Sequence, residues 1–148
     1  MKKHLLILLM SLICLSATAC SNIDSYNDES ATDIVDMNLT GISSTVVYAA
    51  IVNILQNPDN YLGKTIRVSG DYQSFYFEPF ERYFHFVSIE GPSGCCPQAL
   101  KFIYGSDHTS LDNYPTENAL IEVVGVFSSY EEMGRFFYYL AVDTLIVK

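Results

Sequence analysis

Two stretches of the chain share one alternating pattern of hydrophobic and polar positions. Both read Ile-x-Val-x-Gly-x-aromatic, first within residues 65–72 and again within residues 120–127. In the first copy Ile66, Val68 and Tyr72 alternate with mostly polar residues, which predicts a strand with one buried face. A glycine inside a strand weakens it, so its recurrence in both copies indicates a bend or bulge that lets a sheet curl into a small barrel.

Three further strands follow from the same alternation. The chain is expected to turn at 78–81 and to return through a strand at 82–89, and a shorter strand is expected at 99–104. The second glycine-containing strand turns at 131–134, where the two glutamates are expected to be solvated, and returns through a long strand at 136–147. Five strands without intervening helices predict an all-β fold.

One amphipathic helix is expected before these strands. The run 43–45 offers hydroxyl groups that can cap it, and Asn57-Pro58 ends it, because the residue before a proline avoids the helical conformation. Apolar residues at helical spacing would form its buried face: Val46, Val47, Ala50, Ile51, Ile54 and Leu55. We expect this helix to cap the open end of the barrel. A helix lying on a bilayer is the weaker alternative, because no Lys or Arg lines its polar side.

The first twenty residues have the order of an export signal. Lys2 and Lys3 precede an apolar run at 5–15 that is too short to span a bilayer comfortably, and small residues then lead to Cys20. Residues 1–19 are therefore predicted to be a signal peptide.

The end of this leader, Ala17-Thr18-Ala19-Cys20, resembles the lipobox of bacterial lipoproteins. The resemblance implies that Cys20 is acylated, with palmitate or similar chains, and becomes the first residue. Ala17 stands where the family usually has Leu, and ordinary secretion with a free cysteine is the alternative. Two acyl chains make membrane attachment stable. The expected location is the outer face of the cytoplasmic membrane or the outer membrane.

The net negative charge of the chain limits the classes of partner that it can bind. The 148-residue chain has 8 Lys+Arg against 17 Asp+Glu, a net charge of −9, which becomes −11 once Lys2 and Lys3 leave with the leader. Such an acidic domain is a poor partner for nucleic acid. Residues 20–42 are polar and acidic, which predicts a lipidated N-terminus followed by a flexible linker. Residues 43–148 are predicted to form the folded domain.

The predicted strands resemble the OB-fold, a partly open five-stranded barrel. The pattern Tyr61-x-Gly63-Lys64-x-Ile66-x-Val68-x-Gly70 is similar to the start of envelope OB-fold domains classed with tRNA-anticodon-binding-like barrels. Cys95-Cys96, ahead of the third strand, resembles the pair in the OB-fold domain of partner proteins of certain bacterial permeases. The resemblance covers about residues 45–148 and implies architecture more than activity. It departs at 105–118, which shows no helical period where many OB-folds have a helix.

Cys95 and Cys96 are the most unusual chemical feature of the chain. Their Cα atoms should lie about 3.8 Å apart, below the usual disulfide range, so a bond between them needs a strained turn. A strained, exposed disulfide is easily reduced and would suit redox sensing. A zinc or copper site that adds His85 or His108 is a second interpretation, although no spacing selects these ligands. A disulfide between two molecules is the other form of the redox interpretation. A third interpretation is that one or both thiols only pack at the start of a strand.

Aromatic residues gather on the two predicted hairpins, in a chain with Tyr 11, Phe 9 and Trp 0. Most of them are expected to fill the core. In OB-folds, however, such residues can form a stacking platform for ligands. The candidate ligand contacts lie at the first hairpin tip: Tyr76, Phe77, Phe80 and Tyr83.

The sequence contains no recognisable nucleophile setting and no glycine-rich phosphate loop, so we do not expect an enzyme. We expect a non-enzymatic, membrane-tethered binding module of the bacterial envelope, acting on a protein or a small ligand. The alternative is a metal-handling or thiol-redox accessory protein that uses Cys95 and Cys96, with a transporter as a candidate partner.

Overall fold

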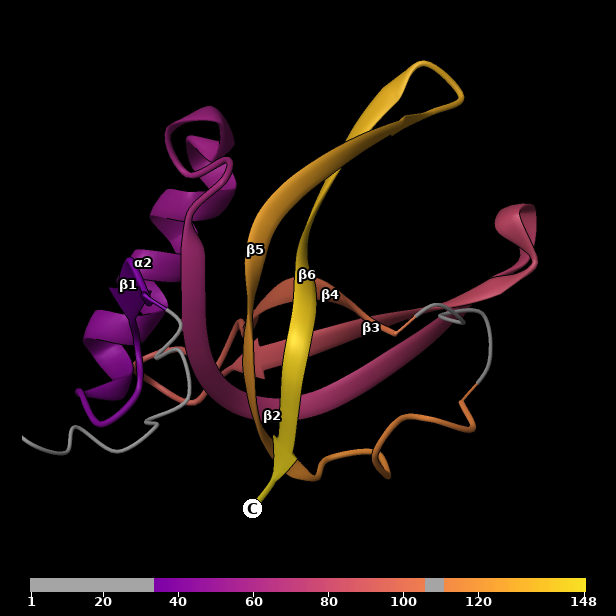
Figure 1. The fold of residues 1–148 in the computed structure, drawn as a ribbon. Helices are drawn as coiled ribbons and strands as arrows, with labels where there is room; N and C mark the ends of the chain where they lie inside the picture. Colours follow the sequence, from indigo (N-terminus) through magenta and orange to yellow (C-terminus); the bar gives the residue numbers. More distant parts are fainter. Residues whose placement is uncertain (1–33, 106–110) are drawn as a thin grey trace, which may run out of the picture. The chain divides into compact units, whose positions relative to one another are not determined.

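Strand β2, Thr65–Phe77, curves strongly and pairs with a different strand at each end (Figure 1). The computed structural model describes residues 34–105 and 111–148. The first half of β2 pairs antiparallel with β5, Leu120–Glu132, and the second half with β3, Arg82–Ile89. The change of partner falls at Asp71, next to the glycine of the first repeat.

All strands of the described residues belong to one six-stranded sheet. Strand β4, Gln98–Tyr104, pairs antiparallel with β3 and parallel with β6, Arg135–Val147, which in turn pairs antiparallel with β5. The pairings therefore form a closed cycle β2–β3–β4–β6–β5–β2, and the short strand β1, Met37–Asn38, joins β2 from outside it. The prediction of a mostly β domain with one helix is confirmed.

The two repeated glycines lie where another backbone comes too close for a side chain. A Cβ atom at Gly70 would lie 2.4 Å from the carbonyl oxygen of Ser88, and one at Gly125 would lie 2.4 Å from that of Ala141. The β5–β6 register also shifts between Val124 and Gly125. This shift confirms the predicted irregularity in the second repeat.

Helix α2, Ser44–Gln56, packs against β3 and β4 and ends before Pro58, as predicted. Ser43 is its N-cap residue, although the hydroxyl makes no capping hydrogen bond. The buried positions are Val47, Ile51 and Ile54. Val46 and Leu55, predicted on the same face, are 54% and 40% exposed, because only one row of side chains meets the sheet. No helix of the described residues is both long and apolar enough to cross a membrane.

The described residues ahead of the helix also belong to the folded unit, which begins at residue 34. Met37–Asn38 pairs with β2, Leu39 is buried in the core, and the Asp36 carboxylate accepts a hydrogen bond from the backbone of β2. A two-residue strand is too short to show alternation, so the pattern could not reveal it. The predicted signal peptide, Cys20 and the start of the linker lie outside the described residues.

Candidate functional site

Strand register brings aromatic and cationic side chains together on one face of the sheet. Directly opposed residues of paired strands share a face. Three opposed pairs form this face: Phe77 with Arg82, Phe86 with Lys101, and Tyr130 with Phe137. The alternate positions His85, Phe102 and Leu140 point into the core and are almost fully buried. The outer face therefore collects aromatic rings around two cations.

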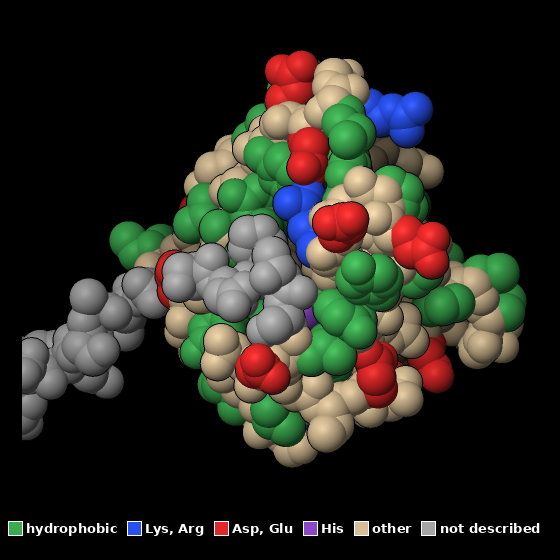
Figure 2. Space-filling view, turned by 90° about the vertical axis from the view of Figure 1, so that its right-hand side faces the viewer, with side chains coloured by type: hydrophobic (Ala, Val, Ile, Leu, Met, Phe, Trp, Pro, Cys, Tyr) green, Lys and Arg blue, Asp and Glu red, His purple; other side chains and the backbone are tan. Residues whose placement is uncertain are grey.

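The tips of the β2–β3 and β5–β6 hairpins diverge above this face (Figure 1). Residues of both hairpins line two cavities of about 530 and 340 Å³, and a third of about 280 Å³ reaches Lys101 of β4 and Leu55 of α2. Glu132 lines the first and second, and Phe84 and Phe137 line the first and third, so the cavities adjoin. We call these three cavities the inter-hairpin cleft. Figure 2, which looks onto the hairpin tips, shows basic side chains there among hydrophobic and acidic ones.

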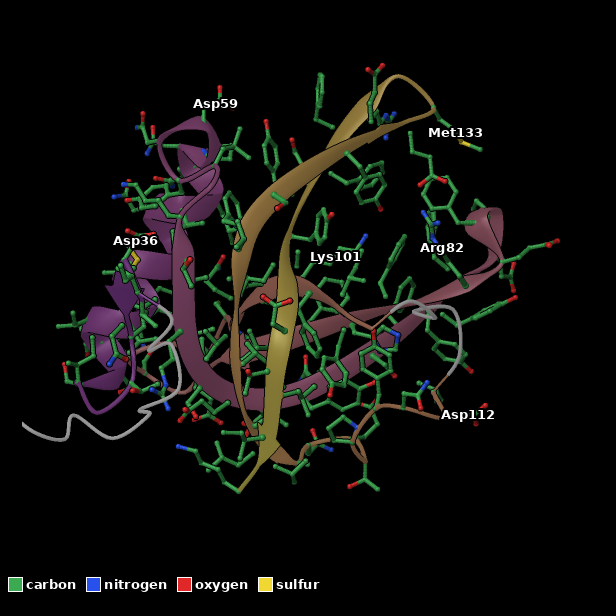
Figure 3. The ribbon with its side chains drawn as sticks, in the orientation of Figure 1. Asp36, Asp59, Arg82, Lys101, Asp112 and Met133 are labelled. Carbon is green, nitrogen blue, oxygen red and sulfur yellow. The ribbon has the colours of Figure 1, made fainter. Side chains whose placement is uncertain are left out.

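Arg82 connects the two hairpins across the cleft. Its guanidinium pairs with the Glu132 carboxylate and lies 5.1 Å and 5.3 Å from the ring centroids of Phe80 and Phe84. Figure 3 shows Arg82 beneath the opposite hairpin tip, which carries Met133. Its Nε atom is buried and has no hydrogen-bond partner among residues 34–105 and 111–148. Glu132, expected to be simply solvated in its turn, is thus half of an ion pair between hairpins.

Lys101 is the second cation of the cleft. Its Nζ atom lies 4.1 Å from the ring centroid of Phe84, 4.7 Å from that of Tyr130 and 5.7 Å from that of Phe137. It donates a 2.6 Å hydrogen bond to the Tyr130 hydroxyl. Burial, with Arg82 nearby, lowers the pKa of Lys101 to about 8. No ion pair joins Lys101 to a carboxylate of the described residues.

His85, a candidate metal ligand, lies in the core instead. It is 1% exposed, and its Nδ1 atom shares a 2.8 Å hydrogen bond with the Tyr72 hydroxyl. Its ring stacks on Tyr114 with centroids 3.4 Å apart. Burial raises the pKa of Tyr72 to about 12, so this hydroxyl keeps its proton at neutral pH. The other candidate histidine, His108, lies outside the described residues.

Cys95 and Cys96 are both free and exposed. A hydrogen bond with Ser93, whose hydroxyl lies 2.9 Å from the Cys95 sulfur, lowers the pKa of that thiol. Cys96 has a left-handed backbone, with φ of 56°, and its carbonyl accepts a hydrogen bond from Tyr48 of α2. The described residues contain no group of three or more His, Cys, Asp or Glu that could hold a metal ion.

The predicted aromatic contacts divide between the two faces of the first hairpin. Phe77 and Phe80 line the inter-hairpin cleft, with ring centroids 5.2 Å apart. Tyr76 and Tyr83 lie opposite each other on the other face. Tyr130, one of the hairpin aromatics noted in the sequence, also lines the cleft. Sequence reasoning did not single out other residues that complete it: Arg82, Phe84, Lys101, Glu132 and Phe137. The shared Arg-aromatic-Phe of both hairpins was the available signal.

Comparison with known proteins finds no family model and no curated protein that matches this chain. Its function is therefore inferred from the geometry of the site and from the sequence.

Proposed function

We propose that this chain is a lipid-anchored protein of the bacterial envelope whose OB-like barrel is a non-enzymatic binding module. The ligand, a small molecule or a short segment of a protein, occupies the inter-hairpin cleft. The closed cycle of five strands and the glycines at Gly70 and Gly125 support the barrel. The observation that carries the binding role is a cleft walled by aromatic rings, with the cations Arg82 and Lys101 inside it and Arg135 at its rim.

The size and lining of the cleft favour binding. Its largest cavity, about 530 Å³, falls within the range of small-molecule sites, roughly 300–1,000 Å³. Aromatic walls with a few fixed polar groups are typical of sites that orient a ligand.

Phe137 and its neighbour Phe136 allow a matched test of the site. Phe137 lines the cleft, whereas Phe136 is 64% exposed and points to the other face of β6. Fragment ligands should be screened by two-dimensional NMR on the full chain. Fragments that bind should shift resonances of both hairpin tips. Phe137→Ala should lower the affinity of these fragments about tenfold, and Phe136→Ala should leave it unchanged. Shifts confined to other surfaces would refute the cleft as the binding site.

The lipid anchor is supported by the lipobox resemblance that ends at Cys20. In a bacterial host, the full chain should incorporate labelled palmitate and sediment with membranes. Cys20→Ala should abolish both the palmitate label and the sedimentation with membranes. Cys14→Ala, a substitution within the leader, should leave both unchanged. A soluble, unlabelled wild-type protein would contradict the anchor.

A second candidate function, thiol-redox or metal handling, is favoured by the two exposed thiols and the lowered pKa of Cys95. Under mild oxidant the chain should lose two hydrogens by mass as Cys95 and Cys96 join. Zinc or copper titration would test metal uptake, with the double Ser variant as control. Inert thiols without bound metal would leave only the binding module.

A further inference from the structure

We propose that the ligand of the inter-hairpin cleft is a small amphipathic anion: one acidic group, such as a carboxylate or sulfonate, on an apolar and preferably aromatic body. This inference rests on the proposed binding function and adds the chemical class of the ligand. Four features of the cleft support this inference. They are the concentration of basic residues, the available donors of Arg82 and Lys101, the aromatic walls, and the Glu132 carboxylate.

The basic residues of this acidic chain are concentrated in the cleft. The described residues contain six of them: Lys64, Arg67, Arg82, Lys101, Arg135 and Lys148. Arg82, Lys101 and Arg135 line the cleft. Arg67 and Lys148 are instead both paired with the buried Glu122 carboxylate. With a net charge of −9 over the whole chain, the cleft is the place where an anion meets local positive charge.

The two inner cations keep donors that an anion can satisfy. Arg82 pairs with Glu132 through one terminal nitrogen, while its buried Nε atom has no acceptor in the part of the chain that the structure describes. A buried unpaired donor is costly, and an acceptor from a ligand would remove that cost. The Lys101 ammonium has three N–H donors, of which one reaches the Tyr130 hydroxyl. Charge-assisted hydrogen bonds to an oxyanion are among the strongest that a protein makes.

The side chains that line the largest cavity favour a ligand with an apolar body. Phe77, Phe80, Phe84 and Phe137 line the largest cavity, and Met133, whose side chain is flexible, completes it at the tip. Tilted and edge-on ring contacts already join these phenylalanines, so a flat ring can extend the same packing.

The Glu132 carboxylate restricts the total charge of the ligand. It lines the same cavities as Arg82 and Arg135 and would repel a second negative group. Glu131 in the adjoining cavity adds to this repulsion. The cleft therefore suits a single acidic group and disfavours polyanions such as nucleic acid.

Two dyes with one skeleton separate the contribution of the charge from that of the apolar body. 1-Anilinonaphthalene-8-sulfonate is an aromatic anion, and 1-anilinonaphthalene is the same molecule without the sulfonate. Binding of each to the purified full chain is measured by fluorescence titration. We expect the anionic dye to bind at least about tenfold more tightly, which corresponds to one charge-assisted hydrogen bond.

Variants at the two cations should affect only the anionic dye. Arg82→Met and Lys101→Met should each lower the affinity for the anionic dye about tenfold and change the affinity for the neutral dye less than about twofold. Lys64→Met is the matched control, because its ammonium also lies over a ring, 5.0 Å from the Tyr61 centroid, outside the cleft. This control should leave both dyes unchanged. Melting curves followed by circular dichroism check that each variant is folded.

A pH titration gives a second readout that does not depend on substitution of Arg82. Lys101 loses its proton above a pH of about 8, so the affinity of the anionic dye should fall between pH 7 and 9.5. The groups that face Lys101 are Tyr130, Arg82 and Glu132. Burial raises the pKa of Tyr130, so its phenol does not explain such a fall. In Lys101→Met the decline should be absent.

The outcomes distinguish the two proposals. If both dyes bind equally and Phe137→Ala weakens both, the cleft is an apolar site, and the anion inference is overturned while the binding function stands. If Phe137→Ala changes neither dye, the cleft is not the site, and both proposals fail. A charge-dependent difference that disappears in Lys101→Met and Arg82→Met would support both.

Discussion

The two hairpins share a sequence pattern but place their arginines in different environments. Arg82 and Arg135 each begin the returning strand of a hairpin. The Arg82 side chain is only 18% exposed and pairs with Glu132 of the other hairpin, whereas Arg135 is exposed at the rim of the cleft. The local sequence pattern thus predicts each hairpin. Whether the arginine is exposed or forms an ion pair depends on the residue that faces it from the other hairpin.

The turns differ as well. The first hairpin reverses through a short 3₁₀ turn, Glu78–Phe80, which places Phe80 over the cleft. The second reverses through Met133 and Gly134, both with positive φ, as in the tight two-residue turns of β-hairpins. The longer turn supplies an additional aromatic wall, and the shorter one supplies a flexible methionine.

The largest expected effect comes from the glycines that the two hairpins share. Gly125→Ala should destabilise the fold by about 3 kcal/mol or more, because its Cβ would meet only backbone atoms of Ala141 and Val142, all within 2.8 Å. Gly70→Ala should cost somewhat less, since two of its three close neighbours are side-chain atoms that can move. Urea unfolding measures both. Gly105→Ala, with no atom within 4 Å but a positive φ, is the control at about 1 kcal/mol.

Tyr72 and Phe127 fill the aromatic position of the two repeats, and both are buried. Tyr72→Phe should cost about 1–3 kcal/mol of unfolding free energy, because it removes the hydroxyl that bonds to His85. Tyr76→Phe, which removes an exposed hydroxyl, should cost almost nothing and serves as control. Equal stability of both variants would mean that the buried hydrogen bond contributes nothing.

The two arginines should differ in their effect on stability. Arg82→Met should lower the free energy of unfolding by about 1–2 kcal/mol, because Glu132 loses its partner and two ring contacts disappear. Arg135→Met should change it by less than about 0.5 kcal/mol, as exposed charges usually do. Similar losses in thermal or urea unfolding would remove the distinction between the hairpins.

The smallest expected effect is a gain. Met133 has a φ of 51°, a conformation that costs ordinary residues about 1–2 kcal/mol and asparagine less. Met133→Asn creates the Asn-Gly pair that such turns prefer, and should stabilise the fold by about 0.5–1 kcal/mol. Weaker dye binding by the same variant would show that methionine is retained for the cleft. A loss of stability would contradict this turn assignment.

The local features of the fold could be predicted from the sequence, and the cleft could not. Strand β3 has the predicted bounds, and α2 ends where Asn57-Pro58 requires, because alternation and proline act within a few residues. The Arg82–Glu132 pair joins residues fifty positions apart, and Lys101 comes from a third strand. Contacts between residues so far apart in the sequence depend on the register of the whole sheet, which no local sequence pattern determines.

The closed cycle of strand pairing does not extend to the hairpin tips. Residues 75–77 of β2 and 128–132 of β5 each have only one neighbouring strand among the described residues, so their outer backbone groups form open edges. An edge that carries exposed Phe75 and Tyr76 invites edge-to-edge aggregation. The charges next to these edges, Glu78 and Glu81 on one tip and Glu131 on the other, therefore keep the protein soluble at the place where it would most readily polymerise.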